Sequence, residues 1–466
     1  MTRVRNLKQR SPNRNINMED DVIPLSNRLL SHSKEESLLA TKFHWSRADR
    51  PKWLAALMCA CSCLYTTRII MPLCMVLVAE ELNWDKRESG LVLSSFFWGY
   101  LITQIPGGFL SDVYGAEKLV MWAIIGCSVT TMVIPIVTSS ALSILSFASP
   151  LALVVAVRVC LGCSQGIFYP ATYSIIGKCL PISERSSGGA LALAGGPLGS
   201  LIMGSLGSLM LVHLGWRMVF IIFGLAGLVW TLVWYYYFLN QNPAVIDMSS
   251  SIREKSVLSK HHKTDTIVPW GVLMWEPAVW AVVLVHFCHN CMYFNLISWL
   301  PTYFHENFPQ AKGWIFNVLP YIANLVGKIV GGKVADKMIQ KGFSVSFTRK
   351  CLETVGTSVS SLILLTSSYA TGFWQALFCM SLTLGLSALT TSGSLCNIQD
   401  LSPTFAGSIS GVVFCVGAIP GILGVYATGY ILHLTNSWKA VFQLTSLICI
   451  SGNLVYIMLG KGKKIA

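Results

Sequence analysis

Charged residues are scarce in this chain of 466 residues. Asp, Glu, Lys and Arg make up 12% of it, about half their share in an ordinary soluble protein. Hydrophobic residues make up 53%, and the mean hydropathy is positive. Apolar segments of about 20 residues recur from Trp53 to Met458, each long enough to cross a hydrocarbon core about 30 Å thick. This composition excludes an ordinary soluble domain and predicts an all-α, polytopic membrane protein.

Acidic residues are absent from the centres of the expected membrane spans, whereas two arginines, Arg68 and Arg158, lie inside apolar runs. An arginine near the centre of a spanning helix costs at least a few kcal/mol, so it normally faces a cavity or a partner. Two buried cations without buried acids indicate a pocket for an anion. Each arginine could instead bond to backbone carbonyls or snorkel to the interface. The nearest acids fall at span ends or in loops, namely Asp112, Glu184, Asp336, Glu353 and Asp400.

Catalytic and metal-binding motifs are also missing. The sequence has no nucleophile elbow, no phosphate-binding loop and no spacing typical of a zinc or redox site, so we expect neither an enzyme nor a bound cofactor. The 15 cysteines fall mostly inside the spans, where they act as small apolar residues. The net charge of +13 is concentrated in the tail and in alternate loops. That is the positive-inside pattern of a membrane protein, and it does not indicate a nucleic acid polymer as partner.

The chain divides into two hydrophobic halves joined by a polar linker. Residues 1–52 contain 11 Lys/Arg and 6 Asp/Glu without apolar periodicity, and we expect a disordered, cytosolic tail there. Six-helix bundles are expected over 53–239 and 279–459, with a cytosolic linker at 240–278 and a short cytosolic tail at 460–466. The twelve expected spans lie near 53–78, 90–111, 118–138, 150–178, 186–213, 218–239, 279–304, 314–335, 350–369, 372–397, 405–433 and 438–458.

Short motifs recur between the two halves at nearly one offset. GGFLSD, which ends at Asp112, recurs 224 residues later as GGKVAD, which ends at Asp336. GWRMVF at 215–220 recurs 222 residues later as SWKAVF at 437–442. Internal repeats of this kind are typical of transporters. They predict two pseudo-symmetric bundles with a binding site between them, near the membrane midplane.

The loop GGFLSDVYGAEK at 107–118 resembles the signature that the major facilitator superfamily has between its second and third helices. Its glycines allow helices to approach closely, and an aspartate at a helix end can bind a helix N-terminus or an arginine. In that superfamily this latch holds the outward-open state. The resemblance implies gating roles for Asp112 and Lys118, and for Asp336 in the second copy.

Longer stretches resemble the vesicular and sodium–phosphate-type organic anion transporters, a family within that superfamily. The family uses an arginine in the first span and another in the fourth for anion binding or chloride-dependent activation. The resemblance implies these roles for Arg68 and Arg158. The matching stretches are SSFFWGYLITQIPGGFLSD at 94–112, RVCLGCSQGIFYPA at 158–171 and SERSSGGALALAGGPLGSLIMGSLGS at 183–208.

Departures from the family pattern favour its nucleotide-transporting branch. Gln165 stands where proton-coupled and glutamate-carrying relatives keep a glutamate, and His289 stands where the glutamate carriers have an arginine. The segments at 298–321 and 392–403 are most similar to the nucleotide branch. We therefore expect Gln165 and His289 at the substrate site. His286, three residues before His289, shares its helix face, and both could equally be packing residues.

Three further residues are candidates because of their chemistry. Tyr169 could stack on a nucleobase, as could Tyr65, Tyr293 and Tyr321. Ser394 and Asn397 lie in an interrupted end of the tenth span that is rich in polar and small residues. For Lys328 we expect a structural role, because it lies two turns before Asp336 and could pair with that aspartate or snorkel to the surface.

The resemblance implies a transporter that loads ATP and related nucleotides, such as ADP and GTP, into secretory or synaptic vesicles or lysosome-related organelles, with chloride as an activating ion. A potential drives an anion by about 2.3 kcal/mol per charge per 100 mV, so the potential made by a vacuolar-type proton ATPase would suffice without a proton-carrying acid. We expect a monomer with both termini cytosolic. The alternatives are a proton- or sodium-coupled carrier of phosphate or another organic anion, such as sialate or glutamate, and an anion receptor that no longer transports.

Overall fold

The computed structural model describes residues 45–139, 149–180, 185–240, 270–311, 313–402 and 406–462, and those from Ser46 onward belong to one compact unit. Most of the expected tail at 1–52 and most of the expected linker at 240–278 lie outside the described residues, as does the end of the tail at 460–466.

Every element in the described ranges is helical. In chain order the elements are α2 Arg50–Leu82, α3 Lys86–Tyr114, α4 Ala116–Val137, α6 Pro150–Gly166, α7 Phe168–Cys179, α8 Arg185–Leu193, α9 Gly195–Ile202, η2 Met203–Gly207, α10 Ser208–Trp234, η3 Tyr235–Asn240, α12 Trp270–Leu273, α13 Pro277–Asn307, α14 Gly313–Gln340, α15 Val345–Thr354, η5 Val355–Val359, α16 Ser360–Ser367, α17 Phe373–Ser387, η6 Ala388–Thr391, α18 Ser394–Leu401, α19 Ala406–Thr435 and α20 Trp438–Leu459.

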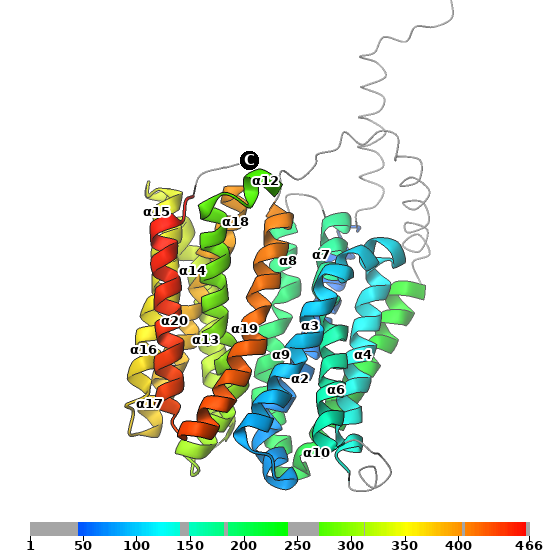
Figure 1. The fold of residues 1–466 in the computed structure, drawn as a ribbon. Coiled ribbons are helices and arrows are strands. Elements are labelled where there is room, and N and C mark those ends of the chain that lie inside the picture. Colours follow the sequence, from blue (N-terminus) through cyan, green and yellow to red (C-terminus); the bar gives the residue numbers. More distant parts are fainter. Residues whose placement is uncertain are drawn as a thin grey trace, which may run out of the picture. The chain divides into compact units, whose positions relative to one another are not determined.

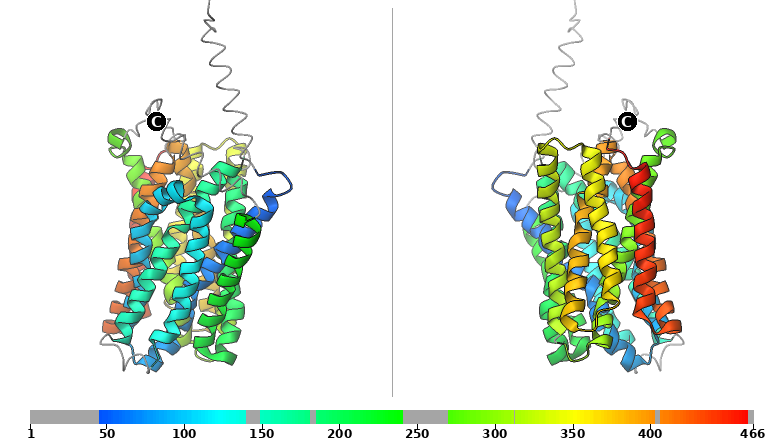
Figure 2. Two further views of the ribbon diagram at one scale, coloured as in Figure 1. Left: turned by 90° about the vertical axis from the view of Figure 1, so that its right-hand side faces the viewer. Right: turned by 90° about the vertical axis from the view of Figure 1, so that its left-hand side faces the viewer.

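These elements make twelve crossings of the bundle, as the sequence predicts. Several crossings are built from two or three pieces, such as α6 with α7, and α15 with η5 and α16. Within α10 the chain turns back at Gly215, whose φ of 75° lies in the left-handed region that favours glycine. Figures 1 and 2 show the helices running side by side, with α2 beginning and α20 ending at the same end of the bundle. We call this the terminal end, and the opposite end the far end.

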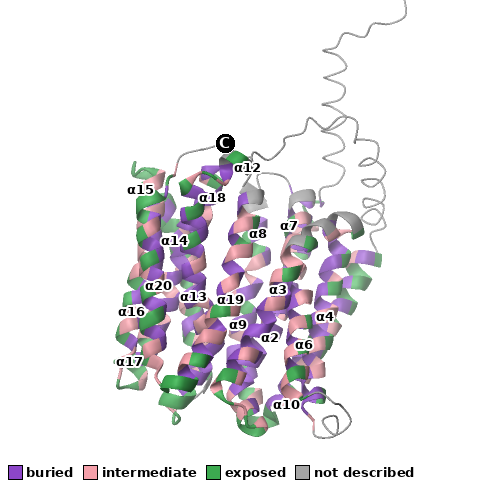
Figure 3. Ribbon diagram, in the orientation of Figure 1, coloured by how far each residue is buried: buried purple, intermediate pink, exposed green. Residues whose placement is uncertain are grey.

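The surface of the bundle is apolar where it would face lipid. Large apolar side chains lie exposed on the outer faces of the helices, among them Val212, Leu232 and Phe378. Figure 3 shows buried residues concentrated between the helices. The most completely buried long helices are α2 and α13, the first helices of the two halves. An all-helical bundle with an apolar exterior satisfies its backbone internally, as a membrane requires.

The same hydrogen bond forms in both halves at the far end. In the first half Trp216 Nε1 donates to Glu81 Oε2 at 2.8 Å, and in the second half Trp438 Nε1 donates to Glu306 Oε2 at 2.9 Å. The two tryptophans are equivalent positions of the repeated motif, and each carboxylate lies in the last turns of the first helix of its half. The sequence repeat is therefore also a repeat of structure, which agrees with two pseudo-symmetric bundles.

Helices α3 and α6 approach each other through a reciprocal pair of glycines. A Cβ atom added to Gly99 would collide with the carbonyl oxygen of Val159, and one added to Gly162 would collide with the carbonyl oxygen of Phe96. Small residues let backbones approach in this way in membrane bundles. The contact matters for function because α3 and α6 hold the surroundings of Arg158.

We expect Gly162→Ala to lower the free energy of unfolding by about 1–3 kcal/mol, because the new methyl group meets a backbone oxygen that cannot move aside. The matched control is Gly332→Ala, since nothing lies within 4 Å of a Cβ at Gly332. Thermal unfolding of the purified protein in detergent, followed by tryptophan fluorescence, measures both. Equal stabilities for the two variants would contradict the close helix contact.

Candidate functional site

A cavity of about 310 Å³ lies between the two halves and takes side chains from both. None of its lining residues in the described part of the chain is Asp or Glu, whereas Arg68 of α2 and Lys328 of α14 both line it. The cavity is rich in tyrosine and in neutral polar groups. Its lining consists of Tyr65, Arg68, Tyr100, Gln104, Tyr169, Tyr173, His286, His289, Asn290, Tyr293, Phe294, Asn324, Lys328, Ser387, Ala388, Thr390, Thr391, Leu395, Phe414, Gly417 and Ala418.

Arg68 lies in a cage of aromatic rings. Its Nη2 is buried and has no hydrogen-bond partner among the described residues. Each ring within about 6 Å of a guanidinium attracts it by roughly 0.5–2 kcal/mol, so the rings hold the cation without neutralising it. The distances from Cζ to the ring centroids are 4.8 Å for Phe96, 5.1 Å for Phe97, 5.4 Å for Phe294, 5.6 Å for Tyr100 and 5.8 Å for Tyr65.

Arg158 is buried but does not line the cavity. Its Nε donates to the carbonyl oxygen of Val92 and its Nη2 to that of Leu93, both at 3.2 Å. Its guanidinium also lies 5.4 Å from the ring of Phe96, which Arg68 contacts as well. The structure thus places Arg158 against the backbone of α3, the alternative that the sequence left open, and places Phe96 in contact with both cations.

Gln165 lies on the same side of α6 as Arg158 and is likewise outside the cavity lining. Its Nε2 donates to the carbonyl oxygen of Leu64 at 2.9 Å and to Thr67 Oγ1 at 3.1 Å. These bonds tie α6 to α2 one turn before Arg68. Gln165 therefore fixes the helix that presents Arg68, and the structure does not bring its amide to the cavity.

His286 and His289 both line the cavity from α13, as expected for residues on one helix face. Asn290 Nδ2 lies 3.2 Å from His286 Nε2 and donates to the carbonyl oxygen of Gly417 at 2.8 Å. His289 Nε2 lies 3.5 Å from Thr390 Oγ1, while its Nδ1 has no partner among the described residues. His289 therefore offers a ring nitrogen that no described side chain uses.

Tyr169 lies at the cavity, and its hydroxyl donates to the Tyr65 hydroxyl at 3.2 Å. Of the other stacking candidates, Tyr65 and Tyr293 line the cavity and Tyr321 does not, while the sequence does not predict Tyr100 and Gln104, which also line it. A helical pattern gives little signal for such residues, because aromatic side chains are common throughout membrane helices.

Ser394 and Asn397 do not line the cavity. The backbone N–H of Ser394 donates to the buried carboxylate of Glu353 at 2.8 Å, and Asn397 Nδ2 donates to the Tyr456 hydroxyl at 2.9 Å. Both residues thus hold α18 against neighbouring helices of the second half.

The three residues with expected gating roles show no latch among the described side chains. The side chain of Asp112 lies outside the described residues, and Lys118 and Asp336 are exposed without an ion pair in the described part. At the terminal end, an ion pair between Arg349 and Asp400 joins α15 to α18 instead. Arg349 Nε donates to Asp400 Oδ2 at 2.7 Å, and Arg349 Nη1 donates to the carbonyl oxygen of Ser392 at 2.8 Å.

The cavity is closed at the far end by contacts between the halves. In the first half Arg217 pairs with Glu81, but Lys439, its repeat counterpart, lies over the ring of Tyr369 at 4.4 Å. Glu306, the counterpart of Glu81, can therefore pair with a cation from the first half. Polar contacts between the start of α3 and the second half include an ion pair of Lys86 with Glu306 and a hydrogen bond from Arg87 Nε to the Tyr426 hydroxyl at 3.1 Å. Asp85, the N-cap of α3, places its Oδ2 3.5 Å from His433 Nδ1.

The opposite side of the cavity leads toward the terminal end. Tyr173 of α7 lines the cavity there and is 50% exposed, whereas Arg68 and Phe294 at the cavity's inner wall are buried. Figure 1 shows α7 at the terminal end. The half-exposed lining residue thus lies toward the terminal end, and the polar contacts between the halves lie at the far end.

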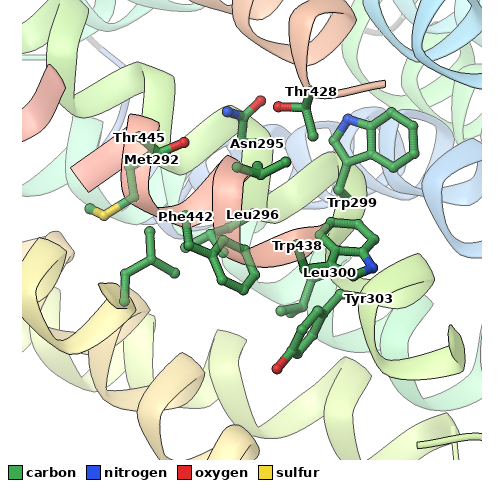
Figure 4. Close-up of a pocket in the computed structure, with 12 residues that line it drawn as sticks. Met292, Asn295, Leu296, Trp299, Leu300, Tyr303, Thr428, Trp438, Phe442 and Thr445 are labelled. Carbon is green, nitrogen blue, oxygen red and sulfur yellow. The ribbon is translucent and has the colours of Figure 1, made fainter. Parts of the chain in front are cut away.

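A second, smaller cavity of about 10 Å³ lies within the second half, beside Trp299 and Trp438 (Figure 4). Its walls are mainly apolar, and Asn295 and Thr428 are polar groups at one side. Space of this size admits about one water molecule. It is not a candidate substrate site.

Comparisons with known proteins agree with this architecture. The sequence profile of the Major Facilitator Superfamily matches residues 53–425. The voltage-gated purine nucleotide uniporter SLC17A9 of Mus musculus is 34% identical over 437 residues, covering 93% of this chain and 94% of that protein. The chloroplastic sodium-dependent phosphate transport protein 1 of Arabidopsis thaliana is 30% identical, covering 96% of this chain and 86% of that protein.

Solved structures show the same fold. A bacterial homologue of the human lysosomal transporter Spinster, in an inward-facing and occupied conformation, superposes with a TM-score of 0.68. The match covers 89% of this chain and 97% of that one at 13% sequence identity. At this identity the likeness concerns the fold alone.

We expect Arg158→Gln to destabilise the protein more than Arg68→Gln does. The first substitution removes donors from two buried carbonyls and should cost about 2–5 kcal/mol of unfolding free energy, because hydrogen bonds to a charged group contribute about 1.5–3 kcal/mol each. Arg68→Gln removes only the contacts of the guanidinium with aromatic rings. Thermal unfolding in detergent compares the two, and an unchanged midpoint for Arg158→Gln would show that the carbonyl contacts are not structural.

We expect Lys86→Gln to loosen the far end. Backbone amides in the first turn of α3 and the last turn of α13 should exchange hydrogen about two- to fivefold faster, since a partly exposed ion pair contributes about 0.2–1 kcal/mol. Hydrogen–deuterium exchange with mass spectrometry measures this. Lys439→Gln, at the same end but engaged within its own half, is the control and should leave both turns unchanged. Equal exchange rates in the two variants would contradict a contact between the halves at Lys86.

Proposed function

We propose, from the premise that the chain belongs to the Major Facilitator Superfamily and is a multi-pass membrane transporter of organic anions, that its substrates are purine nucleotides such as ATP, ADP and GTP. The cavity between the halves is the binding site in this proposal. Arg68 binds the charged end of the nucleotide, and the surrounding tyrosines contact the rest.

The observation that supports this proposal most is the state of Arg68. Its guanidinium is buried, lines the cavity, and is held by aromatic rings without a neutralising acid among the described lining residues. Such a cation lacks a counterion of its own, and a phosphate or carboxylate supplies one. An anion that enters from the terminal end meets this group at the buried end of its path.

Aromatic side chains around the cavity suit a substrate with a planar ring. Tyr65, Tyr100, Tyr169 and Tyr293 all line it. Stacking of a base on an aromatic ring contributes about 1–3 kcal/mol and tolerates different bases. The relative described as a purine nucleotide uniporter supports the same substrate class.

Membrane potential is the driving force that this proposal assigns. The described cavity offers no carboxylate to carry a proton against the nucleotide, and each negative charge gains about 2.3 kcal/mol per 100 mV of inside-positive potential. We place the protein in vesicles or lysosome-related organelles energised by a vacuolar-type proton ATPase, with the terminal end in the cytosol. Chloride as activator belongs to this proposal through the family resemblance.

A proton- or sodium-coupled carrier of phosphate or another organic anion is the second candidate. His286 and His289 line the cavity and are the titratable groups that a proton-coupled carrier would use. The relative described as a sodium-dependent phosphate transport protein favours the sodium variant. The two candidates differ in what drives uptake.

The test is uptake of labelled ATP into liposomes that contain the purified protein, with chloride present. An inside-positive potential set by potassium and valinomycin is compared with an imposed pH gradient and an imposed sodium gradient. We expect the potential alone to drive ATP uptake. Arg68→Gln should lower uptake at least about tenfold, the loss of one charge-assisted contact worth about 1.5–3 kcal/mol.

Arg217→Gln is the control for this experiment, because Arg217 lies at the far end and outside the cavity lining. It should transport as the wild type does. If ATP stays outside while phosphate, glutamate or sialate enters with a proton or sodium gradient, the nucleotide proposal is wrong and the second candidate is correct.

A further inference from the structure

Lys328 presents a second cation to the cavity, from the half opposite Arg68. It lies on α14, whereas Arg68 lies on α2, and both line the same cavity. The sequence favoured pairing of Lys328 with Asp336 or snorkelling to the surface. In the structure Asp336 is exposed, no ion pair joins the two, and Lys328 has no hydrogen bond or ion pair with any described residue.

The packing of α14 keeps Lys328 turned toward the cavity. A Cβ atom on Gly327 would collide with the carbonyl oxygen of Gly385 in α17, so the two helix backbones touch directly beside Lys328. One turn earlier, Asn324 Nδ2 donates to the carbonyl oxygen of Leu384 at 2.8 Å. These two contacts fix the rotation of α14 about its axis, so the position of Lys328 is built into the fold.

Among the described residues that line the cavity, none brings a negative charge to Lys328. The lining residues around it on α13, α17 and η6 are neutral polar or apolar, including His289, Ser387 and Thr390. A cation in such a place is costly unless an anion accompanies it. Lys328 thus meets the condition that supported an anion-binding role for Arg68.

We propose that Lys328 and Arg68 are the two poles of one binding site for anions that carry negative charge on at least two separate groups, such as two phosphates. The inference rests on the proposed function and specifies its substrate class. An oligophosphate reaches both poles with different phosphates, whereas an anion with one charged group, such as phosphate or AMP, reaches only one. The ammonium of Lys328 acts as a mobile point charge, whereas the caged guanidinium of Arg68 is fixed in place.

Because the two poles lie on opposite halves, a bound anion also affects how closely the halves approach each other. Two cations that face each other across a cavity of low dielectric repel when the cavity narrows. An anion between them converts this repulsion into attraction toward both halves. Substrate charge thereby favours closure of the terminal end around the substrate.

The experiment compares Lys328→Gln, Lys328→Arg and the control Lys333→Gln, which changes an exposed lysine on the same helix outside the cavity lining. Potential-driven uptake into liposomes gives KM for ATP, ADP and AMP. We expect Lys328→Gln to raise KM for ATP about 10- to 100-fold, which corresponds to the 1.5–3 kcal/mol of a charge-assisted contact. The rise should shrink from ATP to AMP, Lys328→Arg should retain most of the affinity, and Lys333→Gln should match the wild type.

An equal rise of KM for all three nucleotides, or no rise for any, would overturn the proposal, since either result removes the dependence on the number of phosphate groups. The same holds if Lys333→Gln acts as strongly as Lys328→Gln. Should Lys328→Gln not fold, inhibition of wild-type ATP uptake decides the matter. Pyrophosphate should inhibit at a concentration about tenfold lower than phosphate, and equal potency would sink the two-pole site.

Failure of the proposed function gives a different result. If the wild type takes up no nucleotide, the nucleotide assignment is wrong, and thermal stabilisation of purified protein by pyrophosphate and by phosphate still tests the poles. Preference for pyrophosphate in the wild type that is lost in Lys328→Gln would retain the two-pole site. If pyrophosphate and phosphate stabilise the wild type equally, both the nucleotide assignment and the two-pole site are wrong.

Discussion

The site depends on one constraint, which is that cations lie inside a membrane-spanning bundle without acids beside them in the described part of the chain. The two arginines of the first half meet this constraint differently. Arg158 is bonded to the carbonyls of Val92 and Leu93, whereas Arg68 is held by rings and faces the cavity. The ring of Phe96 contacts both guanidiniums. The backbone of α3 thus holds Arg158, whose Nη1 still has no hydrogen-bond partner among the described residues, whereas Arg68 lines the cavity.

Duplication explains how the two halves can join at one end and remain apart at the other. The carboxylates of Glu81 and Glu306 each accept a hydrogen bond from the tryptophan of the repeated motif. Glu81 also binds Arg217 of its own half, but Glu306 binds Lys86 of the other half. A small asymmetry at equivalent positions therefore turns an internal contact into a contact between halves. Ion pairs of this kind are weak, so the closed end can open during transport.

The fold could be predicted from the sequence because a membrane leaves few choices. Long apolar runs must form helices, and the repeat shows that six of them were duplicated. The break at 388–393 agrees with the interrupted end expected for the tenth span, but the other internal breaks could not be predicted. The expected spans at 150–178 and 350–369 are interrupted at Ile167 and at 355–359. Such breaks follow from packing against other helices, which hydropathy does not register.

The site could be predicted only in part, because periodicity shows which residues share a helix face and not what that face meets. Gln165 does share a side of α6 with Arg158, but that side packs on α2 and α3. Tyr169 lies beyond the break between α6 and α7, and it reaches the cavity with Arg68. For Lys328 the sequence favours a structural role, either pairing with Asp336 two turns on or snorkelling to the surface. The contacts that turn it to the cavity come from α17, about 60 residues away.

The charges at the terminal end belong to the structure of the second half. The crossing from α17 to α18 is interrupted at 388–393, and the backbone groups freed there must find partners inside the bundle. Glu353 accepts the N–H of Ser394, and Arg349 donates to the carbonyl of Ser392 while it binds Asp400. These acids are therefore engaged outside the cavity. The described cavity lining has Arg68 and Lys328 but no Asp or Glu. In the proposed site, discrimination among anions therefore depends on how many of their charged groups the two halves can reach.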